Sequence, residues 1–464
     1  MTSSTTHGTA PARPRIPTAD RARRAARRTW WADGLEAAIW FAAAIGVALM
    51  LRAGGLLASA PIDYVYSAGR ALGIVATVLM LAQVLLVARA PFIERSVGHD
   101  RTTALHTKLG KWAIVLMLAH AAVITSMYGY YDGRGPFAQA VALFTQSWFL
   151  ATAQVALALF LVVLALSLAI VRRRWRYERW HTVHLIVYVA VAAAVPHQFL
   201  EGSTFRGFSA AAWYWLSLYV VAFGALLAFR VVRPLARLRR HGTHVSHVRR
   251  EPDGSATITV TGRDLDRLRA QPGQFMLWRF LDGTRWREAH PFSLSAAPTG
   301  DALRLTVKPS GDHSRSLADV EVGTRVMVEG PLGVFTDAAR CRGGVVLVSA
   351  GVGITPMRTL LEAHDPTEPC AVIVRARSLG EAPLLDEITE LAARARAELT
   401  VLIGERGSGW APRDKDVSLA ELVGDLSDRD VFICGPVPWA DQVERDALAG
   451  GVEPRAIHRE RFGW

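Results

Sequence analysis

Hydrophobic residues are concentrated in the first half of this chain. Residues 35 to 232 consist mostly of long apolar runs, whereas residues 237 to 464 have the mixed composition of a water-soluble protein. An apolar run of about 20 residues is long enough to cross a hydrocarbon core of ~30 Å as a helix. The pattern predicts six membrane-spanning helices, at 35–57, 66–88, 109–128, 148–171, 183–200 and 211–232.

In the polar half, the pattern of apolar and polar residues predicts two successive kinds of structure. Apolar and polar residues alternate at 243–250 and 255–261, and the turn sequence Glu-Pro-Asp-Gly between them predicts a hairpin. Further short strands predict an antiparallel barrel, at 274–280, 303–308 and 325–329. From Gly343, buried-strand runs alternate with helical stretches, which predicts a parallel α/β domain with strands at 345–348, 371–374, 399–403 and 431–433.

The predicted fold class is therefore a multidomain membrane protein. We expect a disordered basic arm at 1–34, a six-helix transmembrane bundle at 35–236, an antiparallel β-barrel at 237–340 and an α/β parallel-sheet nucleotide-binding domain at 341–464.

The formal net charge of +12 would suggest nucleic acid as a partner if the charges were spread over a soluble protein. Most arginines of residues 1–240 instead lie in the arm and in the segments on one side of the predicted spans. The other side receives few beyond Arg52, Arg70, Arg134 and Arg206. By the positive-inside rule, both termini and the polar half are cytoplasmic, in an integral protein of the cell membrane. The charge pattern thus indicates the lipid bilayer, and not nucleic acid, as the partner.

Three cysteines, Cys341, Cys370 and Cys434, all lie in the polar half without Cys-x-x-Cys spacing. This usage fits a reducing cytosol and argues against a disulfide or iron–sulfur framework.

Four histidines lie near the ends of two predicted spans: His106 and His120, then His184 and His197. Ligand-type side chains inside membrane spans are costly and usually functional. On helices, the two spacings correspond to rises of about 21 and 20 Å, so antiparallel spans would place His106 level with His184 near the inner face. His120 would lie level with His197 near the outer face. Imidazole pairs at two depths suit axial ligation of two stacked haems.

Rotation about the helix axis complicates this pairing. Fourteen residues return His120 to within about 40° of His106, but thirteen leave His197 turned well away from His184. A bend or local widening is needed, for which Pro196 offers a cause. His181 competes with His184 for the inner position, and depth favours His184. The alternatives are polar residues satisfied within a bundle and a transported-metal site, although metal sites usually cluster their ligands at one depth.

Two polar motifs follow in the predicted barrel. The extended segment His290-Pro291-Phe292-Ser293-Leu294-Ser295 places two hydroxyls on one face, where they could bond a flavin ring or ribityl chain. The turn that begins Gly311-Asp312-His313-Ser314 supplies backbone N–H groups and hydroxyls that suit a pyrophosphate.

Three further features belong to the α/β domain. The sequence Gly351-Val352-Gly353-Ile354-Thr355-Pro356 lies between a strand and a helix, where glycines let the backbone approach a phosphate. Cys434-Gly435-Pro436 ends a later strand of the same sheet, at the edge where ligands bind in such folds. The chain ends in Phe462-Gly463-Trp464, an aromatic tail that could cover a flavin face.

Taken in order, these motifs resemble the ferredoxin–NADP reductase-type flavoprotein module. The matching residues are His-Pro-Phe-Ser-Leu-Ser at 290–295, Gly-Asp-His-Ser at 311–314, Glu-Gly-Pro-Leu-Gly at 329–333, Gly-Val-Gly-Ile-Thr-Pro at 351–356 and Cys-Gly-Pro at 434–436. With the histidine-bearing spans upstream, residues 66–464 resemble the ferric reductase and NADPH oxidase superfamily. The resemblance implies two b-type haems with paired histidine ligands, FAD and NAD(P)H.

By this resemblance, residues 290–295 hold the flavin, 311–314 meet its pyrophosphate, and 351–356 with Cys434-Gly435-Pro436 line the nicotinamide site. Arg375, Arg377 and Ser378 follow the next strand and could bind a 2′-phosphate, which favours NADPH over NADH. Cys434, Phe462 and Trp464 are the candidates for contact with the reacting rings, and either aromatic residue could shield the flavin.

The expected function is transmembrane electron transfer from cytoplasmic NAD(P)H to an acceptor outside. Ferric chelates, oxygen (yielding superoxide) and quinone all remain open as acceptors. Short predicted outer loops, at 128–144 and 201–212, favour a ferric chelate by leaving the outer haem accessible. Two other classes remain as alternatives: a membrane-anchored flavin reductase without haem, and a metal carrier that uses the histidines.

Overall fold

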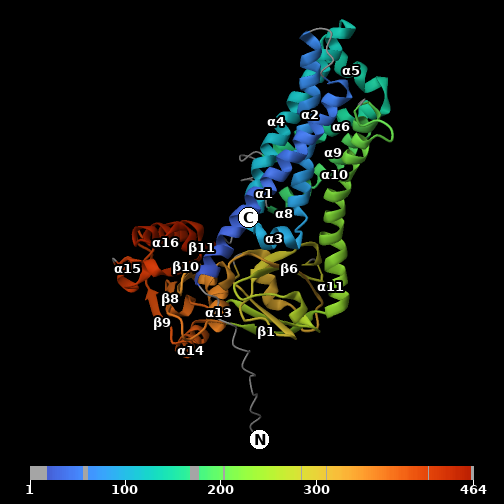
Figure 1. Ribbon diagram of the computed structural model, residues 1–464. Helices are drawn as coiled ribbons and strands as arrows, with labels where there is room; N and C mark the ends of the chain where they lie inside the picture. The colour runs from blue at the N-terminus through green and yellow to red at the C-terminus, as the bar shows by residue number, and fades with distance from the viewer. Residues whose placement is uncertain are drawn as a thin grey trace. The chain divides into compact units, whose positions relative to one another are not determined.

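The computed structural model describes residues 18–55, 61–167, 177–201, 204–283, 285–309, 311–415 and 417–460. Contacts divide the chain into two compact units. One comprises Met1–Trp30, Glu94–Asp100 and Arg233–Gly463, and the other comprises Trp31–Ile93 and Arg101–Val232 together with Trp464. We describe each unit separately (Figure 1).

Helices dominate the second unit. They are α1 (Thr18–Met50), α2 (Pro61–Val87), α4 (His99–Asp132), α5 (Pro136–Gln146), α6 (Trp148–Ser167), α8 (Tyr177–His184), α9 (Ile186–Leu200) and α10 (Ala210–Leu227). Of these, α1 and α4 begin in residues of the first unit. Within the described part of the chain, six helical segments are long and apolar enough to cross a membrane, which confirms the predicted six-span bundle. They run over Trp30–Ala53, Ile62–Val87, Arg101–Asp132, Trp148–Ser167, Arg179–Leu200 and Ala210–His241.

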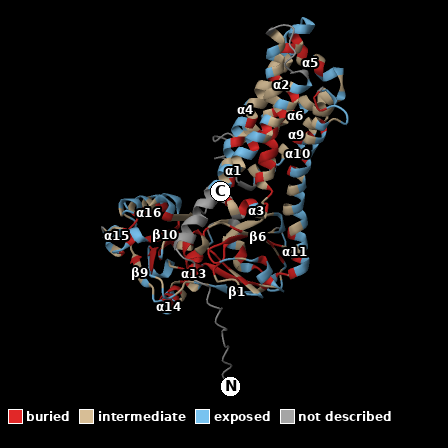
Figure 2. Ribbon diagram, viewed as in Figure 1, coloured by how far each residue is buried: buried red, intermediate tan, exposed pale blue. Residues whose placement is uncertain are grey.

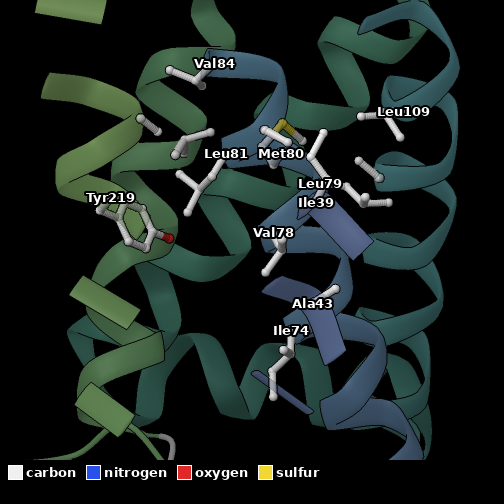
Figure 3. Close-up of a cluster of buried hydrophobic side chains, with 14 of the residues drawn as sticks. Ile39, Ala43, Ile74, Val78, Leu79, Met80, Leu81, Val84, Leu109 and Tyr219 are labelled. Carbon is white, nitrogen blue, oxygen red and sulfur yellow. The ribbon is translucent and has the colours of Figure 1, made fainter. Parts of the chain in front are cut away.

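The core of the bundle surrounds α2. Its side chains from Ile74 to Val84 pack against Ile39 of α1, Leu109 of α4 and Tyr219 of α10 (Figure 3). Lipid tails are as apolar as these residues, so close packing has to hold the helices together. Glycines permit it: a Cβ added at Gly46 would lie only 2.8 Å from Ile74.

Two segments differ from expectation. α1 begins at Thr18, inside the arm predicted to be disordered, because its run of alanine and arginine has high helix propensity; residues 1–17 lie outside the described part. The segment 128–144, predicted as a short loop, instead contains the end of α4 and most of α5. Pro136 sits at the start of α5, where its fixed φ favours a helix.

The first unit contains two three-stranded antiparallel sheets. One has the order β1 (His244–Arg250), β2 (Ala256–Thr261) and β5 (Ala302–Val307). The other has the order β4 (His290–Ser293), β3 (Phe275–Phe280) and β6 (Val326–Leu332). Alternating apolar residues of both sheets share one core, which includes Ile258, Trp278 and Phe280. The hairpin and the antiparallel domain are confirmed.

A parallel five-stranded sheet follows, also as predicted. Its order is β11 (Ile457–Glu460), β10 (Arg429–Cys434), β7 (Gly344–Ala350), β8 (Cys370–Ala376) and β9 (Glu398–Ile403). Separate hydrophobic cores cover its two faces, with α13 (Ile354–Glu362) and α14 (Leu385–Ala395) in one and α16 (Val437–Ala449) in the other (Figure 2). The edge strand β11 was not predicted, because Ile-His-Arg-Glu carries almost no apolar signal.

Shorter helical segments complete the two units. They are α3 (Pro91–Ser96), α11 (Arg233–His241), α12 (Asp312–Ser316) and α15 (Leu419–Leu422).

Candidate functional site

The first histidine pair joins α4 to α8. The ring centres of His106 and His184 lie 6.4 Å apart, with their planes inclined at 74°. Metal–imidazole bonds are about 2.0–2.1 Å, and a ring centre lies roughly 1.2 Å behind its nitrogen, so two imidazoles on opposite sides of one metal have centres about 6.5 Å apart. The separation of this pair therefore fits one iron between two imidazoles.

The helix that carries His184 and His197 is interrupted between them. α8 ends at His184, Leu185 forms a turn, and α9 runs from Ile186 through Pro196 to Leu200. Leu185 keeps helical dihedral angles, with φ −63° and ψ −15°, and α9 continues across Pro196.

His120 is held by α2 on two sides. Its Nδ1 atom lies 2.8 Å from the carbonyl oxygen of Gly69, which can only accept, so Nδ1 carries the proton and Nε2 is left as the metal-ligating atom. Gly73, one turn further along α2, lies flat against the ring: a Cβ there would be 2.6 Å from Nδ1. The imidazole of His197 lies within electrostatic range of His120, so the structure also brings together the second expected pair.

The other imidazoles are positioned differently. The backbone carbonyls of Gln83 and Ala194 face His106 and His197, respectively, but among the described residues neither Nδ1 atom makes a hydrogen bond of normal geometry. Trp180 stacks on His184 with ring centres 5.0 Å apart. His181 lies near the charges of Arg230 and Arg89.

Among the residues that the structure describes, no three or more histidine, cysteine, aspartate or glutamate side chains come together as a metal-binding group. The histidines form pairs.

In the antiparallel domain, β4 presents the His-Pro-Phe-Ser segment beside β3. The hydroxyl of Ser293 is buried and has no hydrogen-bond partner within the described residues. Ser295 was expected to act with it, but its hydroxyl accepts from Thr306 at 2.9 Å and from Arg304 at 3.2 Å. The oxygen of Ser295 is therefore already used by the protein as an acceptor, and Ser293 offers the other hydroxyl. His290 pairs with Glu288, its Nε2 3.1 Å from the carboxylate.

The turn at 311–314 opens α12 and is closed by its own hydrogen bonds. The Ser314 hydroxyl accepts from the Gly311 N–H at 2.8 Å and donates to the Gly311 carbonyl at 3.0 Å. The side chains of Asp312 and His313 lie outside the described residues, so their expected contact with a pyrophosphate stays a prediction.

The two α/β motifs meet at one sheet edge, because β7 and β10 are parallel neighbours. Gly351 has a φ of +57° and opens a tight turn into α13. Gly353 packs directly on β10: a Cβ there would lie 2.1 Å from the carbonyl oxygen of Cys434. Residues 351–356 and Cys434-Gly435-Pro436 thus form one surface at the start of a helix, where a phosphate is favoured. Thr355 is turned inward and donates to the Val352 carbonyl at 2.9 Å.

Cys434 is fully buried at this edge. Burial, followed by the nearby carboxylate of Glu460, raises the pKa of its thiol well above the ordinary value. A raised pKa favours the neutral thiol over the thiolate. The expected aromatic partners, Phe462 and Trp464, lie outside the described residues.

The expected 2′-phosphate residues divide into two groups. Arg375 is buried beside Ala350 and donates to the carbonyl of Ala376, and burial lowers its pKa. Arg377 and Ser378 are exposed just after β8. Sequence reasoning missed Arg406, which follows β9 at the same edge and donates to Gln442 of α16 at 2.9 Å. Its place after a parallel strand was the signal that could have identified it.

A second missed feature joins the antiparallel domain to the α/β domain. Glu387 of α14 accepts from Arg304 at 2.7 Å and from Arg358 at 2.5 Å, and Arg249 lies 3.1 Å away. Burial alone would raise the pKa of Glu387, but hydrogen bonds and charge from Arg304 and Arg358 lower it to about 2.

The structure thus combines a helical bundle that carries paired histidines with an antiparallel domain and a parallel α/β domain. Residues 72–195 match the family model of the ferric reductase like transmembrane component. Residues 244–336 match that of an FAD-binding domain. The chain therefore contains one segment similar to a ferric reductase like transmembrane component and a second segment similar to an FAD-binding domain.

Curated relatives match part of the chain. It is 35% identical over 218 residues to the ferredoxin reductase component of 3-ketosteroid-9-alpha-monooxygenase from Mycobacterium tuberculosis, covering 46% of this chain and 59% of the relative. It is 31% identical over 204 residues to a flavohemoprotein from Vibrio cholerae, covering 42% and 51%. The chain thus spans between half and three fifths of the length of these relatives. Among solved structures, the FAD/NAD-binding domain of nitric oxide dioxygenase from Vibrio cholerae matches with a TM-score of 0.42 and 28% identity, covering 48% of this chain and 98% of that one.

Proposed function

We propose that this protein carries electrons from a cytoplasmic nicotinamide nucleotide, through FAD and two b-type haems, to an acceptor across the membrane. NADPH is the preferred donor in this proposal, with NADH as the second candidate. His106 and His184 would hold the inner haem, and His120 and His197 the outer haem. The excess of arginine on one side of the spans supports a cytoplasmic flavin module and cytoplasmic termini.

One observation carries the haem part of the proposal: the 6.4 Å between the ring centres of His106 and His184. This separation is the one expected for two imidazoles on a single metal. The hydrogen bond from His120 to Gly69 adds independent support, because metal-ligating histidines commonly donate their other ring nitrogen to a carbonyl.

In the soluble unit, the chain's own groups would bind and orient the nucleotides. The free hydroxyl of Ser293 would hydrogen-bond the flavin, and the backbone of 351–356 would approach the dinucleotide phosphates. Arg377 and Ser378 are exposed at the same sheet edge and would take a 2′-phosphate. Cys434, as a neutral buried thiol, would line the nicotinamide pocket without exchanging a proton. Phe462 or Trp464 would cover the flavin.

When bound, FAD supplies the exchange between two-electron hydride chemistry and one-electron transfer, and the haem irons carry single electrons. Two imidazoles on each iron leave no open coordination position. The acceptor would therefore be reduced without binding iron directly. We propose a ferric chelate as this acceptor, supported by the ferric reductase family match.

The test uses detergent-purified full-length protein. A dithionite-reduced minus air-oxidised spectrum should show sharp b-type haem bands, and anaerobic NADPH should produce the same bands. Ferric citrate should then reoxidise the haems faster than oxygen does. Flavin bands alone, in cells supplied with haem, would contradict the haem assignment and leave a membrane-anchored flavin reductase. Rapid reoxidation by oxygen with superoxide formation would contradict the ferric chelate.

A further inference from the structure

The rotation of α9 about its own axis depends on the contacts that this helix makes with its neighbours. A single turn residue with helical dihedral angles, Leu185, separates α9 from α8. His197 must nevertheless point toward His120, and its Nδ1 atom makes no hydrogen bond within the described residues. The direction of this imidazole therefore depends on how α9 is held against its neighbours.

Gln198, the residue after His197, ties α9 to α10 through side-chain hydrogen bonds. The Oε1 atom of Gln198 accepts from the indole Nε1 of Trp215 at 2.8 Å and from the hydroxyl of Tyr219 at 2.9 Å. Its Nε2 atom donates to the carbonyl of Ala194, one turn back on α9, at 3.1 Å. Two donors from α10 therefore converge on one oxygen of α9.

Both donors are rigidly placed. Trp215 and Tyr219 lie one turn apart on α10 and are only 1% and 8% exposed. Trp215 also stacks on Phe205, with ring centres 4.3 Å apart and planes 8° from parallel. Because neither aromatic side chain has room to follow a moving acceptor, the position of the Gln198 oxygen is closely defined.

The two hydrogen bonds to Gln198 restrain the rotation of α9 about its axis. A side-chain atom lies roughly 5–6 Å from the helix axis, so a rotation of about 20° moves it by roughly 2 Å. Such a displacement takes both hydrogen bonds beyond any useful length. In an apolar bundle, no water replaces them, and the freed polar groups are left unpaired at a cost.

We infer that Gln198, with Trp215 and Tyr219, is a positioning residue for the outer haem: it fixes the rotation of α9 and thereby aims His197 at His120. Adjacent helical residues project about 100° apart, so Gln198 can face α10 while His197 faces α4. The inference rests on the proposed function, because it assumes that His197 ligates a haem.

The experiment compares Gln198→Met and Tyr219→Phe with Gln154→Met in full-length protein. Gln154 is a matched control, because it also donates to a backbone carbonyl, that of Ala140, at 2.8 Å. The readouts are haem per protein, the low-spin electron paramagnetic resonance signals and the two midpoint potentials. None of these requires turnover.

Gln198→Met should lose the outer haem, so that haem per protein falls from two to one, while the inner haem signal shows that the bundle is folded. Tyr219→Phe should keep both haems and shift the signal and potential of the outer haem only, and Gln154→Met should match the wild type. Unchanged outer signals in both variants would overturn the inference. A wild-type protein without haem would instead overturn the proposed function.

Discussion

Replacing Gly73 by alanine tests how closely α2 fits the imidazole of His120. The added Cβ would lie 2.6 Å from Nδ1 and 2.7 Å from Cε1, whereas ordinary contact begins at 3.4 Å. The ring and the helix must therefore move apart by 0.8 Å, the difference between 3.4 and 2.6 Å. Overpacking of this kind costs about 1–3 kcal/mol.

This displacement is large for a metal ligand. Ligand distances in working metal sites hold within about 0.2 Å, so a ring shifted by 0.8 Å either leaves the iron or drags it. The hydrogen bond of 2.8 Å to Gly69 would also be stretched or bent. We expect Gly73→Ala to lose most of the outer haem and to keep the inner one.

Haem per protein and a redox titration of the purified variant measure this outcome. Gly224→Ala in α10 is the control, because no atom lies within 4 Å of its added Cβ. Alanine favours a helix over glycine by about 1 kcal/mol, so neither change weakens its helix directly. If Gly73→Ala keeps two haems at wild-type potentials, contact with Gly73 does not position the ligand.

Three further outcomes are expected. His184→Ala should lose the inner haem while His181→Ala keeps it, as haem content will show. Gly353→Ala places a Cβ 2.1 Å from the Cys434 carbonyl, so NADPH-driven flavin reduction should fall at least about tenfold while dithionite still reduces the haems. The pKa of Glu387 in the folded protein is about 2, below the ordinary value of ~4.3. Its ionised carboxylate therefore stabilises the fold above about pH 4.3, and this stabilisation is lost as the pH falls toward 2. Glu387→Gln should remove this acid-side loss and cost roughly 1–2 kcal/mol at pH 7, measured by FAD release on heating.

Much of the architecture was predictable because each element has a strong local signal. Apolar runs identify the spans, and alternation identifies the strands of the antiparallel domain. The meeting of Gly353 with Cys434 was also predictable in kind, since the ends of parallel strands share one edge of a sheet. The helix α5 was not, because an apolar, uncharged segment between two spans can as readily be read as loop or membrane.

The use of side-chain hydroxyls and charges could not be read from the chain. Ser293 and Ser295 are equivalent in an alternating strand. Only the structure shows that Thr306 and Arg304, on a neighbouring strand, donate hydrogen bonds to the hydroxyl oxygen of Ser295. Glu387 likewise gains its importance from arginines far apart in sequence. Such pairings depend on tertiary distances that no local pattern encodes.

The 14-residue spacing of His106 and His120 in α4 matches the spacing of their two contact points on α2. The carbonyl of Gly69 meets His120 and that of Gln83 faces His106, so the two contact points on α2 are also 14 residues apart. Fourteen residues are close to four helical turns, which keeps both contacts on one face of each antiparallel helix. At each of the two contact points, a glycine lets the helices come close. The ring of His120 packs against Gly73 of α2, and the side chain of Gln83 packs against Gly110 of α4. The register of α2 against α4 therefore sets both histidines of α4 at once, whereas His184 and His197 are set separately by α8 and α9.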